Sequence, residues 1–525
     1  MKVKNVATYL ENAALAHPNK TALIFENRGQ WTFEEVEENV SALASALLDL
    51  GIEKGDVVTI LLPSSPEFLF SYFGVLKTGA TANPLNIMLK QRELSYIFND
   101  CQPKVIITTP EVLAQVESAI ANSQLVDTKI VLVGSDGLGQ RKDFEVFEEL
   151  LKKHPKRFES VEVQKDDVGA LLYTSGTTGV PKGVMLTHYN LWTNARHCAD
   201  WAETTYKDVG VCALPMFHAY ALSHVVGELW MESGTLVWHE RFDAEKCLES
   251  MKKYKASTFH GVATMFYAML NHDRIDDYAS EIKLRYCVTG AAVTPVPILE
   301  AWNKRFTPMS EGYGLTEAGP VVTMNPLPGK GVQKPKSCGI PLVPEIEVMV
   351  FNSDDEPVKA GEVGELVVRG PNVMKGYLNK PEETAETLRN GWLHTGDLAY
   401  YDEDGYFYIV DRKKDMICRA GFNIYPKEVE DLIYTHPAVA EVQVVGVPDI
   451  VKGEEVVACI ALKKGRKVTE QEIIDFCRAN LAHYKAPKYV RFFDSLPKTA
   501  TGKLEKVTLR KILEEEFCKE ERNMK

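Results

Sequence analysis

Apolar and polar residues alternate along the chain with two spacings, one typical of helices and one of strands. The clearest helix is predicted to begin at Thr32, where Glu35 completes a capping box, and to end at Gly51. Its apolar positions recur at helical spacing and share one face: Phe33, Val36, Val40, Leu43 and Leu47. This pattern predicts an amphipathic helix packed against a core.

Short apolar runs elsewhere predict buried strands. They lie at 57–62, 105–108, 130–133 and 168–173. Helices are expected at 67–77 and at 187–202, and Thr187 is the expected cap of the second one. Strands that alternate with helices are typical of a mainly parallel sheet, so we expect an α/β fold with a large layered N-terminal domain.

The pattern changes near residue 411, where charged residues replace the apolar rhythm. Beyond this point we expect helices at 426–434 and 469–481 and strands at 441–447, 456–462 and 489–493. Thr469 and Glu472 form a second capping box. The sequence therefore predicts three parts, an N-terminal domain at 1–410, a hinge at 411–414 and a small α+β C-terminal domain at 415–525.

The composition narrows the class of protein. A chain of 525 residues with 45% apolar and 25% charged residues is long enough for several globular units. A formal charge of −13 argues against nucleic acid as the main partner. Ten cysteines without paired spacing, and no apolar signal segment, favour a reduced cytoplasmic location. No apolar run is long enough for a transmembrane segment, which leaves peripheral membrane contact open.

Residues 173–183 carry the strongest chemical signal. They read Tyr-Thr-Ser-Gly-Thr-Thr-Gly-Val-Pro-Lys-Gly and follow a predicted buried strand. Glycines let backbone N–H groups converge, hydroxyls donate hydrogen bonds and a lysine adds a cation, which together suit a polyphosphate. The candidate phosphate-binding residues are Thr174, Ser175, Gly176, Thr177, Thr178 and Lys182. The spacing differs from the Walker pattern because Pro181 precedes the lysine, and a flexible polar linker is the alternative interpretation.

A second motif, Glu-Gly-Tyr-Gly-Leu-Thr-Glu-Ala-Gly-Pro, occupies residues 311–320. The ring of Tyr313, between two glycines, offers a flat face for stacking on adenine. Thr316 can donate a hydrogen bond to a phosphate, and Glu317 is a hard oxygen ligand of the kind that Mg²⁺ takes. The motif's candidate nucleotide-binding residues are Glu311, Gly312, Tyr313, Gly314 and Thr316. Outside the motif, Glu317 would be interpreted as a surface acid.

These two motifs resemble the signatures of the adenylate-forming superfamily, which includes acyl-CoA synthetases, aryl-CoA ligases, luciferases and peptide-synthetase adenylation domains. A third motif, Pro-Lys-Thr-Ala-Thr-Gly-Lys at 497–503, resembles the superfamily's lysine segment. The resemblance covers nearly the whole chain. It implies an acid–thiol ligase that uses ATP to form an acyl-adenylate and then transfers the acyl group to coenzyme A. It also implies parallel-sheet subdomains plus a distorted β-barrel in the large domain, and a mobile small domain.

The resemblance gives several further residues a place near the acid. His218, in an aromatic-His pair, is expected to close and shape the acyl pocket, and we group it with the catalytic residues. Gly261 is expected to line the acyl tunnel, while Gly290 and Ala291 are expected near the acyl carbonyl and the adenine. From the residues alone, His218 would more often be a core histidine, and the small residues would equally serve close packing.

Other residues are implied for the nucleotide and its ion. By resemblance, Asp397 and Arg412 hold the ribose hydroxyls, Glu317 holds Mg²⁺ and Thr174 lies near the same ion. Taken singly, Asp397 and Arg412 would be an ordinary turn acid and an ordinary surface base.

Lys503 is the first choice for a catalytic residue. A carboxylate must approach a phosphate of the same charge, and a lysine that bridges the two would offset the repulsion. In the second half-reaction that lysine obstructs the thiol. The family solves this by rotating the small domain about a hinge, here at Lys414, so that Gly421 lines the channel for coenzyme A. Local sequence alone predicts only turns at Lys503 and Gly421.

The acid itself is less well defined. Within the superfamily the chain most resembles medium- and long-chain fatty acyl-CoA synthetases, through residues 261–267 and 311–317. Aryl-CoA ligases of the coumarate type and malonyl-CoA ligases share much of the pattern, although no obvious cation at 260–270 would pair with a second carboxylate. A non-catalytic nucleotide-binding sensor is the alternative from another class, but it would lack Lys503. The expected ligands are the acid, ATP, Mg²⁺ and coenzyme A, bound by a monomer or homodimer.

Overall fold

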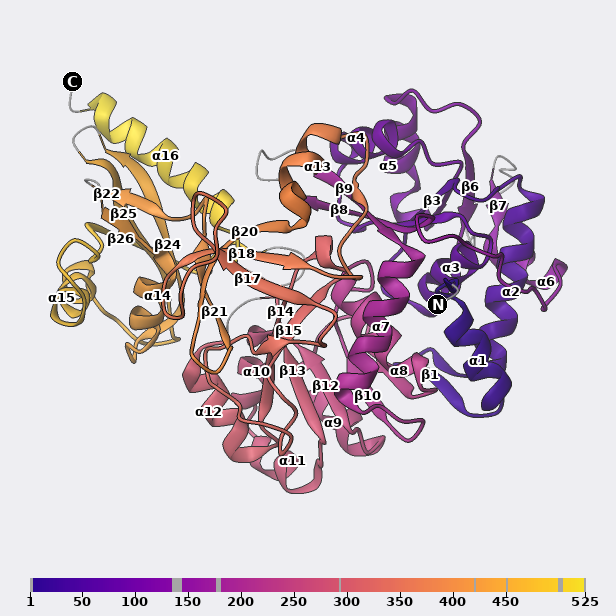
Figure 1. Ribbon diagram of the computed structural model, residues 1–525, viewed down its shortest axis with the longest axis horizontal. Helices are drawn as coiled ribbons and strands as arrows, with labels where there is room; N and C mark the ends of the chain where they lie inside the picture. Colours follow the sequence, from indigo (N-terminus) through magenta and orange to yellow (C-terminus); the bar gives the residue numbers. More distant parts are fainter. Residues whose placement is uncertain are drawn as a thin grey trace.

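The computed structural model is an α/β protein with a large body and a small C-terminal domain (Figure 1). The structure describes residues 3–134, 144–175, 181–291, 294–419, 422–449, 452–498 and 504–523. Within these ranges the body contains three sheets and the small domain contains a fourth. The predicted fold class is therefore confirmed.

The first sheet of the body is eight-stranded, in the order β19-β9-β8-β4-β3-β5-β6-β7. Its strands from β8 to β7 are parallel to their neighbours, and β9 and β19 are antiparallel additions at one edge. The strands are β3 (Val57–Leu61), β4 (Thr81–Pro84), β5 (Val105–Thr108), β6 (Lys129–Leu132), β7 (Glu145–Val146), β8 (Val168–Ser175), β9 (Pro181–Thr187) and β19 (Gly376–Tyr377). The helices of this region are α1 (Thr8–Ala16), α2 (Phe33–Asp49), α3 (Pro66–Lys77), α4 (Gln91–Cys101), α5 (Pro110–Ala121) and α6 (Phe147–Lys153). Helical crossovers are what parallel neighbours require.

The second sheet is nine-stranded, in the order β16-β15-β14-β13-β12-β10-β11-β1-β2. Its strands are β1 (Thr21–Phe25), β2 (Gly29–Thr32), β10 (Val209–Cys212), β11 (Thr235–Trp238), β12 (Thr258–Gly261), β13 (Tyr286–Thr289), β14 (Met309–Gly314), β15 (Val321–Met324) and β16 (Ile340–Pro341). The helices are α7 (His188–Ala202), the π-helix η1 (Tyr220–Val226), α8 (Gly227–Met231), α9 (Ala244–Lys253), α10 (Ala263–Leu270), α11 (Ile275–Glu281), α12 (Val296–Arg305) and the 3-10 turn η2 (Thr316–Ala318). All neighbouring strands are parallel in the part of this sheet that runs β14-β13-β12-β10-β11-β1. This again agrees with the predicted parallel architecture.

The third sheet corrects one expectation. The resemblance implied a distorted β-barrel, but the described strands β17 (Glu347–Phe351), β18 (Gly364–Arg369), β20 (Leu393–Tyr401) and β21 (Phe407–Arg412) form an open antiparallel sheet. A barrel closes only when its two edge strands pair. Here β21 is an edge whose outer side meets a single bridge from Gly339. Helix α13 (Pro381–Thr387) and the 3-10 turn η3 (Arg389–Gly391) lie between β18 and β20 in the chain.

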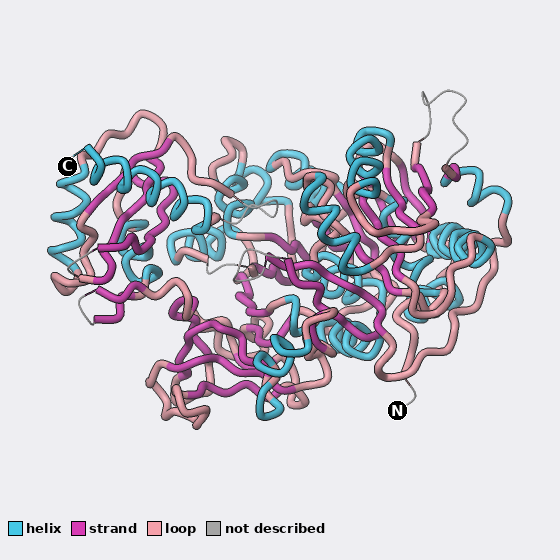
Figure 2. The backbone as a smooth tube through the Cα atoms, turned by 90° about the horizontal axis from the view of Figure 1, so that it is seen from above, coloured by secondary structure: helices cyan, strands magenta, loops and turns pink. Residues whose placement is uncertain are grey.

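The small domain packs helices against a five-stranded sheet, seen to the left in Figure 1 and again in Figure 2. Its elements are β22 (Ile417–Arg419), β23 (Phe422–Ile424), α14 (Pro426–Tyr434), β24 (Val439–Asp449), β25 (Gly453–Leu462), α15 (Glu470–Asn480), β26 (Tyr489–Phe493) and α16 (Lys506–Asn523). The α+β prediction agrees with these elements. The hinge at 411–414 stays a proposal, and it falls where β21 ends and a turn begins.

The capping residues predicted from the sequence mark the observed starts of three helices. Both predicted capping boxes are present, with the Thr32 and Thr469 hydroxyls each accepting a hydrogen bond from the backbone N–H three residues later. Thr187 caps α7 in the same way. The predicted apolar face of α2 is fully buried. Among the described helices, none combines the length and apolarity that crossing a membrane would require.

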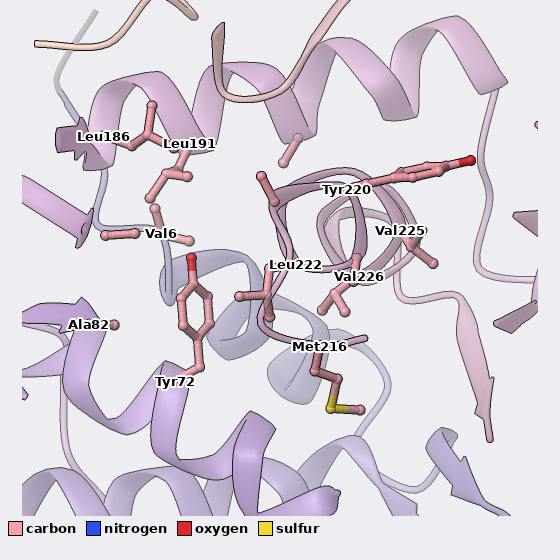
Figure 3. Close-up of a cluster of buried hydrophobic side chains, with 14 of the residues drawn as sticks. Val6, Tyr72, Ala82, Leu186, Leu191, Met216, Tyr220, Leu222, Val225 and Val226 are labelled. Carbon is pink, nitrogen blue, oxygen red and sulfur yellow. The ribbon is translucent and has the colours of Figure 1, made fainter. Parts of the chain in front are cut away.

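One cluster of buried side chains joins segments that are distant in the sequence (Figure 3). It includes Val6 before α1, Tyr72 on α3, Leu191 on α7, Met216 before η1 and Leu222 on η1. Burying side chains of this size stabilises a fold by roughly 1.5–3 kcal/mol each. The cluster therefore fixes η1 against the helices of the first sheet.

A buried lysine ties the end of α3 to neighbouring helices. Lys77 is 0% exposed, and its Nζ lies 2.9 Å from Glu11 and also contacts Glu37. It donates a further hydrogen bond to the Ser41 hydroxyl at 3.1 Å. A buried cation needs such partners because an unpaired one would be costly. Lys77 is thus a structural residue.

Candidate active site

A cavity of about 780 Å³ lies where the three sheets of the body meet. This size is typical of small-molecule sites, which span roughly 300–1,000 Å³. The predicted residues in its wall are Thr174, Lys182, His218, Gly290, Ala291, Gly312, Tyr313, Gly314, Thr316, Glu317 and Arg412. Residues from β8, β14 and β21, far apart in the chain, are thus gathered around one space.

The predicted phosphate loop connects two antiparallel strands. Thr174 on β8 pairs with Lys182 on β9, and the backbone of Ser175 pairs with Pro181. The sequence predicted β8 but not β9. This hairpin points Thr174 and Lys182 at the same cavity. Gly176, Thr177 and Thr178 lie outside the described residues.

A second contact set joins β14 to the third sheet. The Tyr313 hydroxyl donates to Asp397 Oδ2 at 2.6 Å, and Arg412 Nε lies 3.2 Å from Asp397 Oδ1. Asp397 and Arg412 face each other across the β20–β21 pair. The carboxylate is nearly buried, with 8% of its side chain exposed. Asp397 therefore contacts two other predicted site residues that come from separate segments of the chain.

The glycines beside Tyr313 have a packing reason that the sequence did not reveal. A Cβ at Gly312 would lie 2.6 Å from the Met324 sulfur, and a Cβ at Gly314 would lie 2.1 Å from the Pro320 carbonyl oxygen. Larger residues would therefore push β14 away from β15 and its preceding turn. The glycines keep Tyr313 close to the neighbouring strand as well as open to the cavity.

Glu317 lies in the wall next to an aromatic residue that the sequence did not flag. The Tyr377 hydroxyl donates to Glu317 Oε1 at 3.0 Å, and Lys182 Nζ lies 4.9 Å from the centre of the Tyr377 ring. Burial raises the pKa of Glu317, although hydrogen bonds from its own backbone and from Tyr377 oppose the shift. Tyr377 belongs to a two-residue strand, too short for any periodic signal.

Glu311 lies behind the wall, one residue before Gly312. Its carboxylate accepts hydrogen bonds from the backbone N–H groups of Thr294 at 3.4 Å and Lys336 at 3.2 Å. Burial raises its pKa to about 7, against the lowering effect of these two N–H groups. In this position Glu311 holds two loops together around β14.

Of the four residues expected near the acid, three line the cavity and one does not. His218 lines the cavity, and its Nδ1 accepts a hydrogen bond from the Tyr220 N–H at 3.1 Å. Gly290 and Ala291 follow β13 and also line the cavity, and Ala291 has a φ of 66°, which is unusual outside glycine. Gly261 ends β12, where a Cβ would lie 2.8 Å from the ring of Phe259, so close packing accounts for this glycine.

Of the residues expected to act during the domain movement, Lys414 is among those that the structure describes. Lys414 lies in the turn between β21 and β22, and burial followed by the charge of Arg412 lowers its pKa. Gly421 and Lys503 lie outside the described residues.

Two further wall residues were not predicted. Glu365 accepts a hydrogen bond from the Gly396 N–H at 3.0 Å and contacts Lys413 Nζ at 3.3 Å. His224, on η1, also lines the cavity. Neither residue belongs to a motif that the sequence analysis identified, so only the tertiary arrangement brings them to the site.

Comparison with known proteins agrees with this geometry. Residues 10–378 match the AMP-binding enzyme family, and residues 428–503 match the AMP-binding enzyme C-terminal domain. A long-chain-fatty-acid–CoA ligase of Bacillus subtilis is 37% identical over 98% of this chain and 95% of its own length. A feruloyl-CoA synthase of an Amycolatopsis species is 37% identical over 91% of this chain and 93% of its own.

Solved structures share the fold. An ATP-bound MatB from Rhodopseudomonas palustris has a TM-score of 0.90 at 30% identity, covering 98% of this chain and 99% of its own. The two family matches lie one in the body and one in the small domain, and described residues of the motifs at 173–183 and 311–320 lie around one cavity. The chain belongs to the AMP-binding enzyme family, within the adenylate-forming superfamily, and is an acid–thiol ligase of the acyl-CoA synthetase class.

Proposed function

We propose that this enzyme activates a monocarboxylic acid as an acyl-adenylate, with release of pyrophosphate, and then transfers the acyl group to coenzyme A. The observation that supports it most is that the motifs at 173–183 and 311–320 converge with Arg412 on one cavity, where Thr174, Lys182, Tyr313, Glu317 and Arg412 share a wall. A non-catalytic sensor would have no need of the lysine at position 503, which the chain retains.

In this proposal the nucleotide lies along β14. The ring of Tyr313 stacks on the adenine, and the Asp397–Arg412 pair binds the ribose hydroxyls. Lys182 and the hydroxyls of Thr174 and Thr316 face the phosphates from two sides of the cavity. The phosphate groups thus meet donors from β8, β9 and η2.

The wall residues also fit a divalent cation. Glu317 supplies a hard carboxylate oxygen, Thr174 supplies a hydroxyl, and both line the same space. The raised pKa of Glu317 indicates that its hydrogen bonds compensate its negative charge only in part, and a cation would compensate it further. We propose that these two residues hold Mg²⁺, which when bound would neutralise phosphate charge and make the α-phosphorus easier to attack.

Lys503 is the proposed catalytic cation. Its ammonium would lie between the attacking carboxylate and the α-phosphate, where it offsets the repulsion between two anions. His218 shapes the place of the carboxylate. After adenylation, rotation about Lys414 would remove Lys503 and bring Gly421 to the coenzyme A channel.

Two classes of acid are proposed. A medium- or long-chain fatty acid is the first, supported by the Bacillus subtilis relative. An aryl acid is the second, supported by the feruloyl-CoA synthase and by the polar residue His224 in the wall. A dicarboxylic acid is disfavoured, because residues 260–270 contain no lysine or arginine that would pair with a second carboxylate.

The test is carboxylate-dependent release of pyrophosphate across short to long fatty acids and cinnamates. AMP formation that depends on coenzyme A is followed in parallel. Release with at least one acid, followed by thioester formation, is the expected result. No release with any acid would contradict the enzyme proposal, and release with aromatic acids alone would contradict the fatty-acid assignment.

A further inference from the structure

A cluster of buried polar side chains lies behind one part of the cavity wall. It consists of His224 on η1, Glu228 on α8, His260 on β12 and Tyr286 on β13. Each of these residues is at most 1% exposed, and His224 also lines the cavity. Burying polar groups costs free energy unless each group has a partner. The partners of these side chains therefore decide what the cluster can do.

Glu228 lies at the centre of the cluster. The Tyr286 hydroxyl donates a hydrogen bond to its Oε1, and His260 Nε2 lies 3.6 Å from the same oxygen. Its other oxygen, Oε2, lies 2.9 Å from His224 Nε2. This distance is short enough for a hydrogen bond, but the two groups are not oriented to form one. Among the described residues, the carboxylate thus accepts a hydrogen bond from Tyr286 but none from either imidazole.

Several polar atoms at the centre of the cluster lack partners. No described residue forms a hydrogen bond with His224 Nε2, Glu228 Oε2 or either ring nitrogen of His260. Buried polar atoms are almost always hydrogen-bonded, because an unpaired one is costly. A neutral imidazole and a carboxylate both carry lone pairs that a metal ion accepts. The unpaired atoms therefore indicate a site for a cation.

The spacing of these atoms fits a single ion. One nitrogen or oxygen atom from each of His224, Glu228 and His260 lies within 4.8 Å of the other two. Zinc binds such atoms at about 2.0–2.2 Å, so two ligand atoms of a tetrahedral site are about 3.3 Å apart. The separations of 2.9 Å and 3.6 Å lie on either side of this value. The ring centres of the two histidines are 5.0 Å apart and their planes meet at 86°, an arrangement in which one ion can contact a nitrogen of each ring.

The local backbone supports the same interpretation. His224 and Glu228 are four residues apart where η1 continues into α8, which places both side chains on one helical face. Residues Tyr220–Val226 form a π-helix, a rare conformation that is frequent at functional sites. Within the part of the chain that the structure describes, no other group of three histidine, cysteine, aspartate or glutamate side chains has its ligand atoms this close together.

We propose that His224, Glu228 and His260 bind one zinc ion, which joins η1, α8 and β12 behind the cavity wall. Two imidazoles and a carboxylate are a ligand set typical of zinc, whereas Mg²⁺ prefers oxygen ligands alone. A water completes the four ligands, and the ion enters from the cavity that His224 lines. Tyr286 is a positioning residue, because its hydroxyl holds the carboxylate of Glu228. This inference does not depend on the proposed ligase function.

The test measures metal content and affinity. Tag-free protein from cells grown with added zinc is expected to contain about one zinc ion per chain by elemental mass spectrometry. After removal of the ion with a chelator, titration with zinc gives the affinity, and titration with Co²⁺ is expected to give the strong visible bands of a four- or five-coordinate site. His224→Asn and His260→Asn should weaken zinc binding by more than about 100-fold, because each removes a ligand. Tyr286→Phe should weaken it by about tenfold.

Two variants are controls for the place of the ion. His239 is a buried histidine whose ring nitrogens are both paired, with Nδ1 2.6 Å from Glu26 Oε2 and Nε2 3.0 Å from Ser250 Oγ. His239→Asn is therefore expected to keep the zinc. Glu317→Gln changes the proposed Mg²⁺ ligand in the cavity wall and is also expected to keep it. Loss of zinc in Glu317→Gln with retention in His260→Asn would overturn the inference, because the ion would then belong to the nucleotide site.

The wild-type measurements decide the inference even if a histidine variant does not fold, which thermal unfolding of each variant checks. Wild-type protein that contains no zinc after growth with the metal, and that takes up neither zinc nor Co²⁺ on titration, would overturn it. The cluster would then be a purely polar contact between packed elements. Zinc bound to a protein that releases no pyrophosphate with any acid would support the metal site and contradict the ligase proposal alone.

Discussion

Two carboxylates of the active-site region, one half-buried and one fully buried, have pKa values shifted in opposite directions. Glu317 lies in the cavity wall with the Tyr377 hydroxyl as its side-chain partner, and burial raises its pKa. Glu228 lies behind the wall between two histidines and Tyr286, and these histidines lower its pKa below the ordinary value. The more deeply buried carboxylate is the one with the lowered pKa, so burial alone does not decide the state of a carboxylate.

The difference indicates two uses of an acid in this region. A carboxylate that the protein compensates only in part is suited to bind something positive, which fits the proposed role of Glu317 as a cation ligand. A carboxylate with several buried partners is suited to hold packed elements together, as Glu228 of α8 does with residues of η1, β12 and β13. The first use contributes to the reaction and the second to the structure behind the cavity wall.

The largest effect is expected at the residue proposed to join the acid to the nucleotide. Lys503→Ala should slow pyrophosphate release by about 100- to 1,000-fold, roughly 3–4 kcal/mol, because a positioned cation is lost at the transition state. Thioester formation from supplied acyl-adenylate should largely survive. Lys498→Ala is the matched control, since Lys498 pairs with Glu441 inside the small domain. Equal damage to both half-reactions would contradict the domain rotation.

The second-largest effect is expected on protein stability, where Glu228 should differ from Glu317. Glu228→Leu should lower the free energy of unfolding by about 3 kcal/mol, because it leaves a buried cluster without its anion. The loss should be greatest at neutral pH and shrink in acid, since a carboxyl with a lowered pKa stabilises the fold only while it is ionised. Urea and thermal unfolding across pH measure this. Glu232→Ala, which breaks a partly exposed pair with Arg196, is the control and should change little.

Glu317→Gln should give the opposite pattern. Pyrophosphate release should fall by about tenfold to a hundredfold, roughly 1.4–2.8 kcal/mol, with a higher demand for Mg²⁺. The raised pKa of Glu317 means that the native state binds its proton more tightly than the unfolded state, so this group's contribution to stability falls as pH rises through the raised pKa. The variant lacks that decline and should be at least as stable as the wild type at neutral pH. A clear loss of stability would remove the contrast with Glu228.

The smallest effect is expected from Tyr377→Phe. Removing the hydroxyl that donates to Glu317 should cost about 1 kcal/mol, or about fivefold in activity. The pKa of Glu317 should rise further, because the lost hydrogen bond favoured the ionised form. The acid limb of the pH–rate profile should therefore move to higher pH. Tyr401→Phe removes a hydroxyl bonded to Val358 and should leave the profile unchanged.

The sequence predicted several helices and strands correctly. The capping boxes at Thr32 and Thr469 and the cap at Thr187 gave helix starts that the structure confirms, since a cap involves residues three apart. Strands β5 and β26 and helix α14 were predicted with their observed bounds. The hairpin strand β9 was missed, because its proline and lysine hide the alternation and its partner β8 supplies the pairing.

The sequence by itself determined the family, the order of the motifs and most of the helices and strands, because each of these is written in residues close together in the chain. Only the tertiary structure decided that Tyr313, Asp397 and Arg412 touch, that the third sheet stays open, and that Tyr377 and His224 reach the cavity. The tertiary structure also decided the pKa shifts of Glu317 and Glu228. These shifts depend on burial and on charged groups from other elements. The fold brings these groups together from positions far apart in the chain, so a local sequence pattern does not predict the shifts.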